Sequence, residues 1–110
     1  MAIYYIYILE CNNGAFYTGY TTNIKRRYQE HLQGSPKCKY TRAFPPKQLV
    51  ACWQINSTLS HTLKIEALIK KLQRSKKLQL IHFPEQLLAQ CQHITDAIFP
   101  FHFQHQQQPT

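Results

Sequence analysis

Acidic residues are scarce in this chain of 110 residues: 5 Asp and Glu stand against 13 Lys and Arg, which gives a formal net charge of +8. A basic excess of this size on a small domain favours a polyanionic partner, with nucleic acid as the first candidate. The alternative is a charged surface that only keeps the protein in solution. The positive charges fall into two clusters: Lys25, Arg26, Arg27, Lys37, Lys39, Arg42 and Lys47, and then Lys64, Lys70, Lys71, Arg74, Lys76 and Lys77.

Cysteine pairs with metal-binding spacing, long apolar runs and a leader sequence are also missing. The four cysteines (Cys11, Cys38, Cys52 and Cys91) are far apart and none belongs to a CxxC pair, so we expect no structural zinc site. No stretch approaches the ~20 apolar residues of a membrane span. The first residues lack the basic start of a signal peptide. We therefore expect one domain with free thiols in a reducing cytoplasm.

The N-terminal residues predict a β-hairpin. Residues 3–9 are almost entirely β-branched and aromatic, which is typical of a central strand that is covered on both faces. Residues 12–14, Asn-Asn-Gly, are a strong turn signal, and residues 15–20 predict the second strand.

The length of the hairpin turn decides which side chains share a face. A two-residue turn would place Tyr7 and Tyr17 on opposite faces of the sheet. A three-residue loop with Gly14 in the left-handed conformation instead pairs Leu9 with Tyr17, and Tyr7 with Gly19. We favour the second register, because Gly19 beside Tyr7 leaves a gap that a ligand could fill.

An amphipathic helix is expected next, from a cap at Thr22 or Asn23 to a stop near Gly34. At about 100° per residue, one arc of the helix faces inward. This arc comprises Ile24, Arg27, Tyr28, His31 and Leu32. Burying the guanidinium of Arg27 is costly unless it has partners. Arg27 and His31, four positions apart on the buried arc, therefore indicate a functional site.

The remaining sequence predicts a basic loop, a third strand and further helices. The expected elements are a loop over 35–46, a strand over 48–55, a helix from Ser60 to about Gln73, a helix over 75–81 and a helix over 85–91. We assign residues 1–83 to a compact domain and 84–98 to a C-terminal helical extension. Residues 99–110 are rich in glutamine, and we expect them to be disordered.

Short motifs occur along these elements in a fixed order. They are Tyr5-Ile6-Tyr7 in the first strand, Tyr17-Thr18-Gly19 in the second, Arg27 and His31 on the helix, Lys39-Tyr40-Thr41-Arg42 in the loop, and Glu66 at the start of the run that ends at Leu72. From residue 3 to about residue 81, the chain closely resembles the GIY-YIG nuclease superfamily. Within the superfamily it is most similar to the small single-domain bacterial proteins. Each motif is a weak signal alone, but their order and spacing are specific.

The resemblance implies metal-dependent hydrolysis of phosphodiester bonds and gives five residues a role. Tyr7 and Tyr17 match the two motif tyrosines, and Arg27 matches the catalytic arginine. His31 matches a position that holds His or Tyr, and Glu66 matches the glutamate that binds one divalent ion, Mg²⁺ or Mn²⁺. An arginine always carries its charge and can bind two phosphate oxygens, and a carboxylate suits Mg²⁺. Either tyrosine can orient or deprotonate the attacking water.

Each of these residues also has a structural interpretation. The two tyrosines can be packed strand aromatics, Arg27 can lie over the edge of the core, and His31 can be an interior histidine. Glu66 can be a solvated helix residue paired with Lys70. We favour the functional interpretation, because all five residues occur in the order that the family site requires.

Three positions depart from the family pattern. Tyr5 replaces the glycine of the first motif, and Thr18 replaces the isoleucine of the second. Tyr20 stands where other branches often have a lysine. The absent lysine removes a cation beside the scissile phosphate, which affects the expected rate more than the fold.

We therefore predict an α/β (α+β) domain in which helices flank a small, mostly antiparallel, three-stranded sheet. We predict a metal-dependent endonuclease that acts on DNA in preference to RNA and is selective for flaps, branches or single strands, in repair or recombination. The residues expected to contact nucleic acid are Gly19, Lys25, Arg26, Lys37, Lys39, Tyr40, Arg42, Lys70 and Lys71. Four aromatic residues fit either base stacking or the core: Phe16, Tyr40, Phe44 and Trp53. The alternatives are a nucleic-acid-binding module without turnover and an interaction subunit of a larger nuclease assembly.

Overall fold

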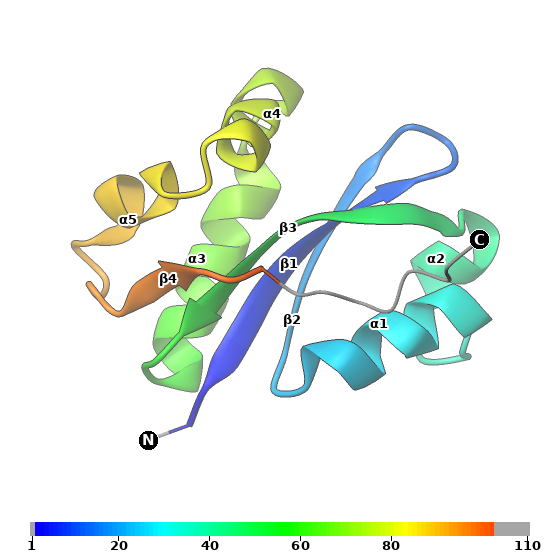
Figure 1. Ribbon diagram of the computed structural model, residues 1–110, viewed down its shortest axis with the longest axis horizontal. Coiled ribbons are helices and arrows are strands. Elements are labelled where there is room, and N and C mark those ends of the chain that lie inside the picture. The colour runs from blue at the N-terminus through cyan, green and yellow to red at the C-terminus, as the bar shows by residue number, and fades with distance from the viewer. Residues whose placement is uncertain (1, 103–110) are drawn as a thin grey trace.

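The computed structural model describes residues 2–102 and contains one antiparallel four-stranded sheet with helices on both faces (Figure 1). In chain order the elements are β1 (Tyr4–Cys11), β2 (Phe16–Thr21), α1 (Ile24–Gln33), α2 (Lys39–Ala43), β3 (Pro46–Ile55), α3 (Leu59–Lys71), α4 (Arg74–His82), α5 (Gln86–Cys91) and β4 (Ile98–Pro100). The strand order is β2-β1-β3-β4, so β2 forms one edge of the sheet. This arrangement confirms the predicted fold class.

The hairpin has the register that the three-residue loop predicts. Leu9 lies opposite Tyr17, and Tyr7 lies opposite Gly19. Gly14 has a φ of 84°, which is the left-handed conformation that glycine adopts without strain. Tyr7 and Tyr17 therefore lie on the same face of the sheet.

Alternating side chains of β1 divide the core between the two faces of the sheet. Ile6 and Ile8 face α3, α4 and α5, and Ile65 and Ile69 of α3 are fully buried against them. Tyr7 and the other inward residues of the opposite face pack against α1. Figure 1 shows α1 and α2 on one side of the sheet and the three later helices on the other. Strand β1 is thus buried on both faces, as its unbroken apolar sequence predicts.

Helix α1 has both of the expected ends. The Asn23 side chain accepts a hydrogen bond from the backbone N–H of Arg26 at 3.0 Å, and Gly34 ends the helix with a φ of 68°. The predicted inward arc is wrong at its last position, because Leu32 is 45% exposed. At this last turn His31 is the residue that points inward.

The sheet has four strands, and not the predicted three. Strand β4 pairs with β3, placing Ile98 opposite Ile55, and Ile98 is buried. A strand of three residues that ends in Pro100 has no alternation for the sequence to reveal, and proline is tolerated because β4 is an edge strand. Residues 99 and 100 are therefore in the sheet and not in a disordered tail. The rest of that prediction, over 103–110, lies outside the described residues.

Two other boundaries differ from the prediction. The basic loop contains the short helix α2, a single turn whose five residues are too few to show a period. Helix α3 is capped by Thr58, whose side chain accepts a hydrogen bond from the N–H of His61 at 3.0 Å, and not by Ser60. Within residues 2–102, no helix combines the length and apolar character that a membrane crossing requires.

Candidate active site

Three aromatic side chains meet between the sheet and α1. The hydroxyl oxygen of Tyr7 lies 2.8 Å from Nε2 of His31. The Tyr17 ring packs edge-on against the His31 ring, with 5.3 Å between centroids. Tyr7 and His31 are each 1% exposed, whereas Tyr17 is half-buried. Tyr17 is therefore the tyrosine of this cluster that a ligand can reach directly.

Gly19 lies directly beneath the Tyr7 ring. A Cβ atom at Gly19 would stand 2.5 Å from the hydroxyl oxygen of Tyr7 and 2.7 Å from its Cζ. The gap expected beside Tyr7 is thus filled by the Tyr7 side chain itself, and no ligand space remains there. Glycine is required at this position because any side chain would displace Tyr7 from His31.

Arg27 lies one helical turn before His31 on α1 and is half-buried. Its Nη1 donates a hydrogen bond to Oε1 of Glu30 at 2.9 Å. Burial alone would lower the pKa of Arg27, but the Glu30 carboxylate and the Tyr7 hydroxyl outweigh it, and the pKa is raised above its ordinary value. Arg27 therefore keeps its positive charge although it is half-buried.

Burial keeps both members of the Tyr7–His31 pair neutral. Burial raises the pKa of Tyr7 well above its usual value, and the nearby Arg27 guanidinium offsets only part of this effect. Burial, together with the positive charge of Arg27, lowers the pKa of His31 to about 4, against a smaller opposing effect of Glu30. At neutral pH the pair thus consists of a phenol and an uncharged imidazole.

A residue that the sequence did not single out completes this cluster. Nδ1 of His31 lies 2.7 Å from the hydroxyl oxygen of Thr41, which belongs to α2 and is 1% exposed. The Thr41 hydroxyl donates in turn to the backbone carbonyl of Cys38 at 3.3 Å. In the sequence, Thr41 is marked only by its place within the run Lys39-Tyr40-Thr41-Arg42. A single helical turn is too short to show a hydrophobic period, so the sequence does not predict that Thr41 points inward.

A row of aromatic rings leads from the site to the surface. Tyr40 stacks on Tyr17, with centroids 5.6 Å apart and planes 16° apart, and Phe44 packs against Tyr40 at 5.2 Å. Tyr40 and Phe44 are both exposed. We call Tyr17, Tyr40 and Phe44 the aromatic row. Trp53, by contrast, is fully buried and belongs to the core.

Phe16 and Arg74 have a structural role at the hairpin. The Arg74 guanidinium lies 4.3 Å from the centre of the Phe16 ring and donates a hydrogen bond to the carbonyl of Gly14 at 2.7 Å. These contacts join the start of α4 to the hairpin turn, so this member of the second basic cluster has protein partners.

The predicted nucleic-acid-binding cations are all exposed and lie in two places. Those on or beside α1 and α2 are Lys25, Arg26, Lys37, Lys39 and Arg42, and those at the end of α3 are Lys70 and Lys71. Lys39 and Arg42 belong to the same short helix as Tyr40, so they flank the aromatic row. Positive charge and exposed rings therefore occur together on α2.

Glu66 is separated from the other predicted catalytic residues by the sheet. It belongs to α3, which packs on the face of Ile6 and Ile8, whereas Tyr7 and Arg27 lie on the other side. Its side chain is 13% exposed, and its carboxylate lies 3.5 Å from the ammonium group of Lys70. Helix α3 packs mainly against β2, the edge strand. A ligand that contacts both Glu66 and Tyr17 must therefore cross the β2 edge.

One carboxylate is a sparse but suitable donor set for a hard divalent cation. Among residues 2–102, no group of three His, Cys, Asp or Glu side chains is close enough to hold a metal ion. Mg²⁺ retains several waters and is often held by one or two carboxylates together with substrate phosphates. The lone carboxylate of Glu66 fits that pattern and does not fit zinc.

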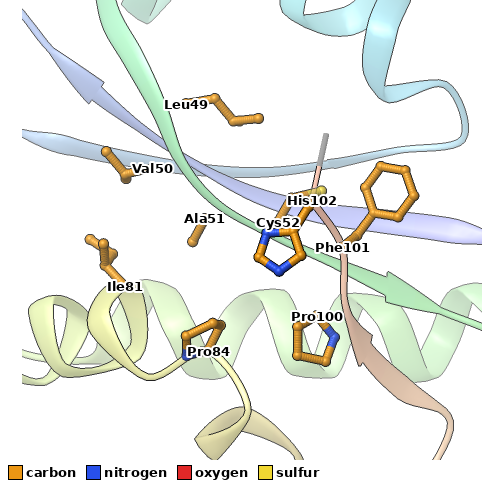
Figure 2. A pocket seen from close by; sticks show the side chains of 9 residues that line it. All are labelled: Leu49, Val50, Ala51, Cys52, Ile81, Pro84, Pro100, Phe101 and His102. Carbon is orange, nitrogen blue, oxygen red and sulfur yellow. The ribbon is translucent and has the colours of Figure 1, made fainter. Parts of the chain in front are cut away.

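A separate pocket of about 250 Å³ lies beside β3, where the pairing with β4 ends. Figure 2 shows Ala51, Cys52, Ile81 and Pro84 among the residues that line it. Burial raises the pKa of the Cys52 thiol to about 12, so this thiol is not a nucleophile at neutral pH. His102 is the one titratable side chain besides Cys52 among the residues that line this pocket, and none of them is Lys, Arg, Asp or Glu.

Comparison with known proteins shows the family. Residues 3–79 match the GIY-YIG catalytic domain. A UPF0213 protein from Syntrophus aciditrophicus is 51% identical over 77 residues, which cover 70% of this chain and 87% of the relative. UPF0213 protein BH0048 from Halalkalibacterium halodurans is 45% identical over 78 residues, which cover 71% and 81%. A solution NMR structure of UPF0213 protein BH0048 from Bacillus halodurans aligns with a TM-score of 0.49 and 43% identity, covering 74% of this chain and 84% of that one. This chain therefore belongs to the GIY-YIG domain family, among its small UPF0213 members.

Proposed function

We propose that this protein is a metal-dependent endonuclease that hydrolyses phosphodiester bonds in DNA. The observation that carries the proposal is the buried cluster in which Arg27 and Tyr7 adjoin a neutral His31. A half-buried positive charge beside two neutral, oriented polar groups is costly, and its ion pair with Glu30 offsets only part of that cost. This cost is expected at a site where charge develops during a reaction.

In this proposal the residues of the cluster divide the work. Arg27 binds non-bridging phosphate oxygens, because its charge is permanent and its N–H groups can donate in pairs. Tyr17 contacts the substrate directly, because it is the half-buried tyrosine. Tyr7 accepts a hydrogen bond from the attacking water and so orients it. The raised pKa of Tyr7 argues against an ionised tyrosine base in the resting protein.

Glu66 would hold the Mg²⁺ or Mn²⁺ ion. When bound, the metal would neutralise charge on the phosphate oxygens and so favour attack on phosphorus. Because Glu66 and Arg27 lie on opposite faces of the sheet, the phosphate would cross the edge formed by β2.

The aromatic row and its cations favour unpaired or distorted DNA over a regular duplex. Exposed rings such as Tyr40 and Phe44 can stack on bases only when the bases are unstacked from each other. Lys39 and Arg42 contact phosphates without reading sequence. Flaps, branches and single strands present such bases, and we propose by analogy with the family that the protein acts in repair or recombination.

Cleavage assays test the proposal. Wild-type protein and Glu66→Ala are incubated with supercoiled plasmid and with duplex, flapped, branched and single-stranded oligonucleotides, in Mg²⁺, Mn²⁺ or chelator. We expect cleavage that requires both the metal and Glu66. Binding without cleavage, unaffected by chelator or by Glu66→Ala, would instead show a nucleic-acid-binding module. Tyr20 in place of the family lysine is the observation that favours this second candidate.

A further inference from the structure

We propose that Thr41 is a positioning residue: its hydroxyl fixes the tautomer of His31, so that the oxygen of Tyr7 meets the attacking water as a hydrogen-bond acceptor. The proposal rests on the proposed function. It goes further in assigning a role to Thr41, which the sequence marks only as part of the run Lys39-Tyr40-Thr41-Arg42.

The hydrogen atoms of the cluster can be counted one by one. The Thr41 hydroxyl has one hydrogen, which it donates to the carbonyl of Cys38. It must therefore accept at its 2.7 Å contact with His31, and Nδ1 of His31 must be the protonated nitrogen. A neutral imidazole carries one N–H, so Nε2 is left as an acceptor. The Tyr7 hydroxyl then donates to Nε2 across 2.8 Å.

The opposite arrangement leaves a buried hydrogen without an acceptor. If Thr41 donated to Nδ1, His31 would carry its hydrogen on Nε2 and donate it to Tyr7. The Tyr7 hydroxyl would then need another acceptor, and the Arg27 guanidinium, with which it also forms a hydrogen bond, can only donate. Tyr7 is 1% exposed, so in the protein without substrate bulk water does not supply that acceptor. An unmade hydrogen bond in such a place is costly.

The direction of these hydrogen bonds decides what Tyr7 presents to a substrate. With its hydrogen held by His31, the Tyr7 oxygen keeps its free lone pairs for Arg27 and for a water molecule. With the other tautomer, the Nε2–H of His31 would donate to a lone pair of the Tyr7 oxygen. The hydroxyl hydrogen of Tyr7 would then point away from His31. Thr41 thus determines whether Tyr7 meets the attacking water as an acceptor or as a donor. An acceptor leaves both oxygen lone pairs of that water free for attack on phosphorus, whereas a donor would occupy one of them.

Nitrogen NMR of the histidine rings, combined with kinetics, tests this proposal. Thr41→Val removes the hydroxyl at nearly constant volume, and Thr41→Ser restores it. In the wild type and in Thr41→Ser we expect a protonated Nδ1 and an unprotonated Nε2 on His31. In Thr41→Val we expect the Nε2–H tautomer to appear and kcat to fall by about 10²-fold, while KM changes little. A merely structural role would not change the tautomer.

Two results would overturn the proposal. One is a wild-type His31 protonated on Nε2, which needs no variant and therefore no assumption about folding. The other is a folded Thr41→Val that keeps both the tautomer and the wild-type kcat. If the wild type cleaves no nucleic acid but shows the Nδ1–H tautomer that Thr41→Val loses, the proposed function fails, and the effect of Thr41 on His31 stands.

Discussion

The hydroxyl of Tyr7 and the imidazole of His31 form a buried hydrogen bond of 2.8 Å between residues 24 positions apart in the sequence. It joins the central strand β1 to the last turn of α1. Because both side chains are almost fully buried, the bond does not compete with water, and removing either partner leaves the other unsatisfied. The bond therefore contributes to the stability of the fold and sets the geometry of the site.

Phenylalanine in place of Tyr7 or of Tyr17 should separate the contribution to stability from the contribution to cleavage. In Tyr7→Phe, Nε2 of His31 loses its partner, so we expect a loss of about 1–3 kcal/mol in the free energy of unfolding, together with a loss of cleavage. Tyr17→Phe keeps the ring contacts, so cleavage should fall with little change in stability. Urea unfolding and initial rates measure both quantities. A Tyr7→Phe protein as stable as the wild type would contradict the structure.

The stability of the protein should depend on pH through His31. Its pKa is about 4 in the folded protein and near 6.5 when unfolded. Below pH 6.5 the unfolded chain therefore takes up a proton that the folded protein does not, so stability is complete above pH 6.5 and falls toward pH 4. The loss should be about 3 kcal/mol. Urea unfolding from pH 4 to pH 8 measures it.

The matched control for the pH experiment is His31→Gln. The groups facing His31 are Arg27 and Glu30 from its own helix, Tyr7 from β1 and Tyr17 from β2. Glutamine leaves these groups in place and does not titrate. The slope between pH 4 and pH 6.5 should therefore be smaller in His31→Gln, and equal slopes in the two proteins would show that other groups cause the dependence.

Glu66→Gln should abolish metal-dependent cleavage without unfolding the protein. Glutamine has the same shape but lacks the charge that attracts Mg²⁺ or Mn²⁺. Lys70→Gln is the complementary variant, since it removes the ammonium group 3.5 Å from the carboxylate and should increase affinity for the metal. A calorimetric titration with Mn²⁺ measures the affinity of each protein for the metal. Unchanged Mn²⁺ affinity in both variants would show that the ion is held elsewhere.

The aromatic row should matter for single strands more than for duplexes. Tyr40→Ala should cost about 1–3 kcal/mol in binding a single-stranded oligonucleotide, the range measured for stacking of one base on an aromatic ring. Tyr40→Phe keeps the ring and should bind as the wild type does. Lys39→Ala should reduce the salt dependence of DNA affinity by the equivalent of about one phosphate contact. It should weaken the binding of all DNA substrates to the same extent. Fluorescence anisotropy at several salt concentrations distinguishes these effects.

The sequence predicts the hairpin register and α1 well, because both have local physical signals. Gly14 has to adopt a positive φ, and Asn23 and Gly34 cap the helix. The buried arc of that helix also predicts that Arg27 and His31 point inward. These features depend on neighbours within a few residues, and such neighbours are visible in a sequence.

The features that the sequence does not predict depend on contacts between distant segments. Strand β4 exists because it pairs with β3, and its three residues have no pattern of their own. Thr41 joins the site because α2 folds against α1. Gly19 leaves no gap for a ligand, because Tyr7 is long enough to fill it. The two faces of the sheet separate Glu66 from Arg27, a relationship that no spacing in the chain reveals.

Substitution of Arg27 tests whether the cluster around Tyr7 and His31 is the catalytic site. Arg27→Ala removes the charge, and Arg27→Lys keeps it but loses the paired donors that bind two phosphate oxygens. We predict that, with Mg²⁺ present, cleavage under single-turnover conditions falls about 10²-fold or more in Arg27→Ala and is only partly restored in Arg27→Lys. Both proteins should remain folded and still bind DNA. Wild-type cleavage rates in a purified Arg27→Ala protein would show that Arg27 takes no part in catalysis.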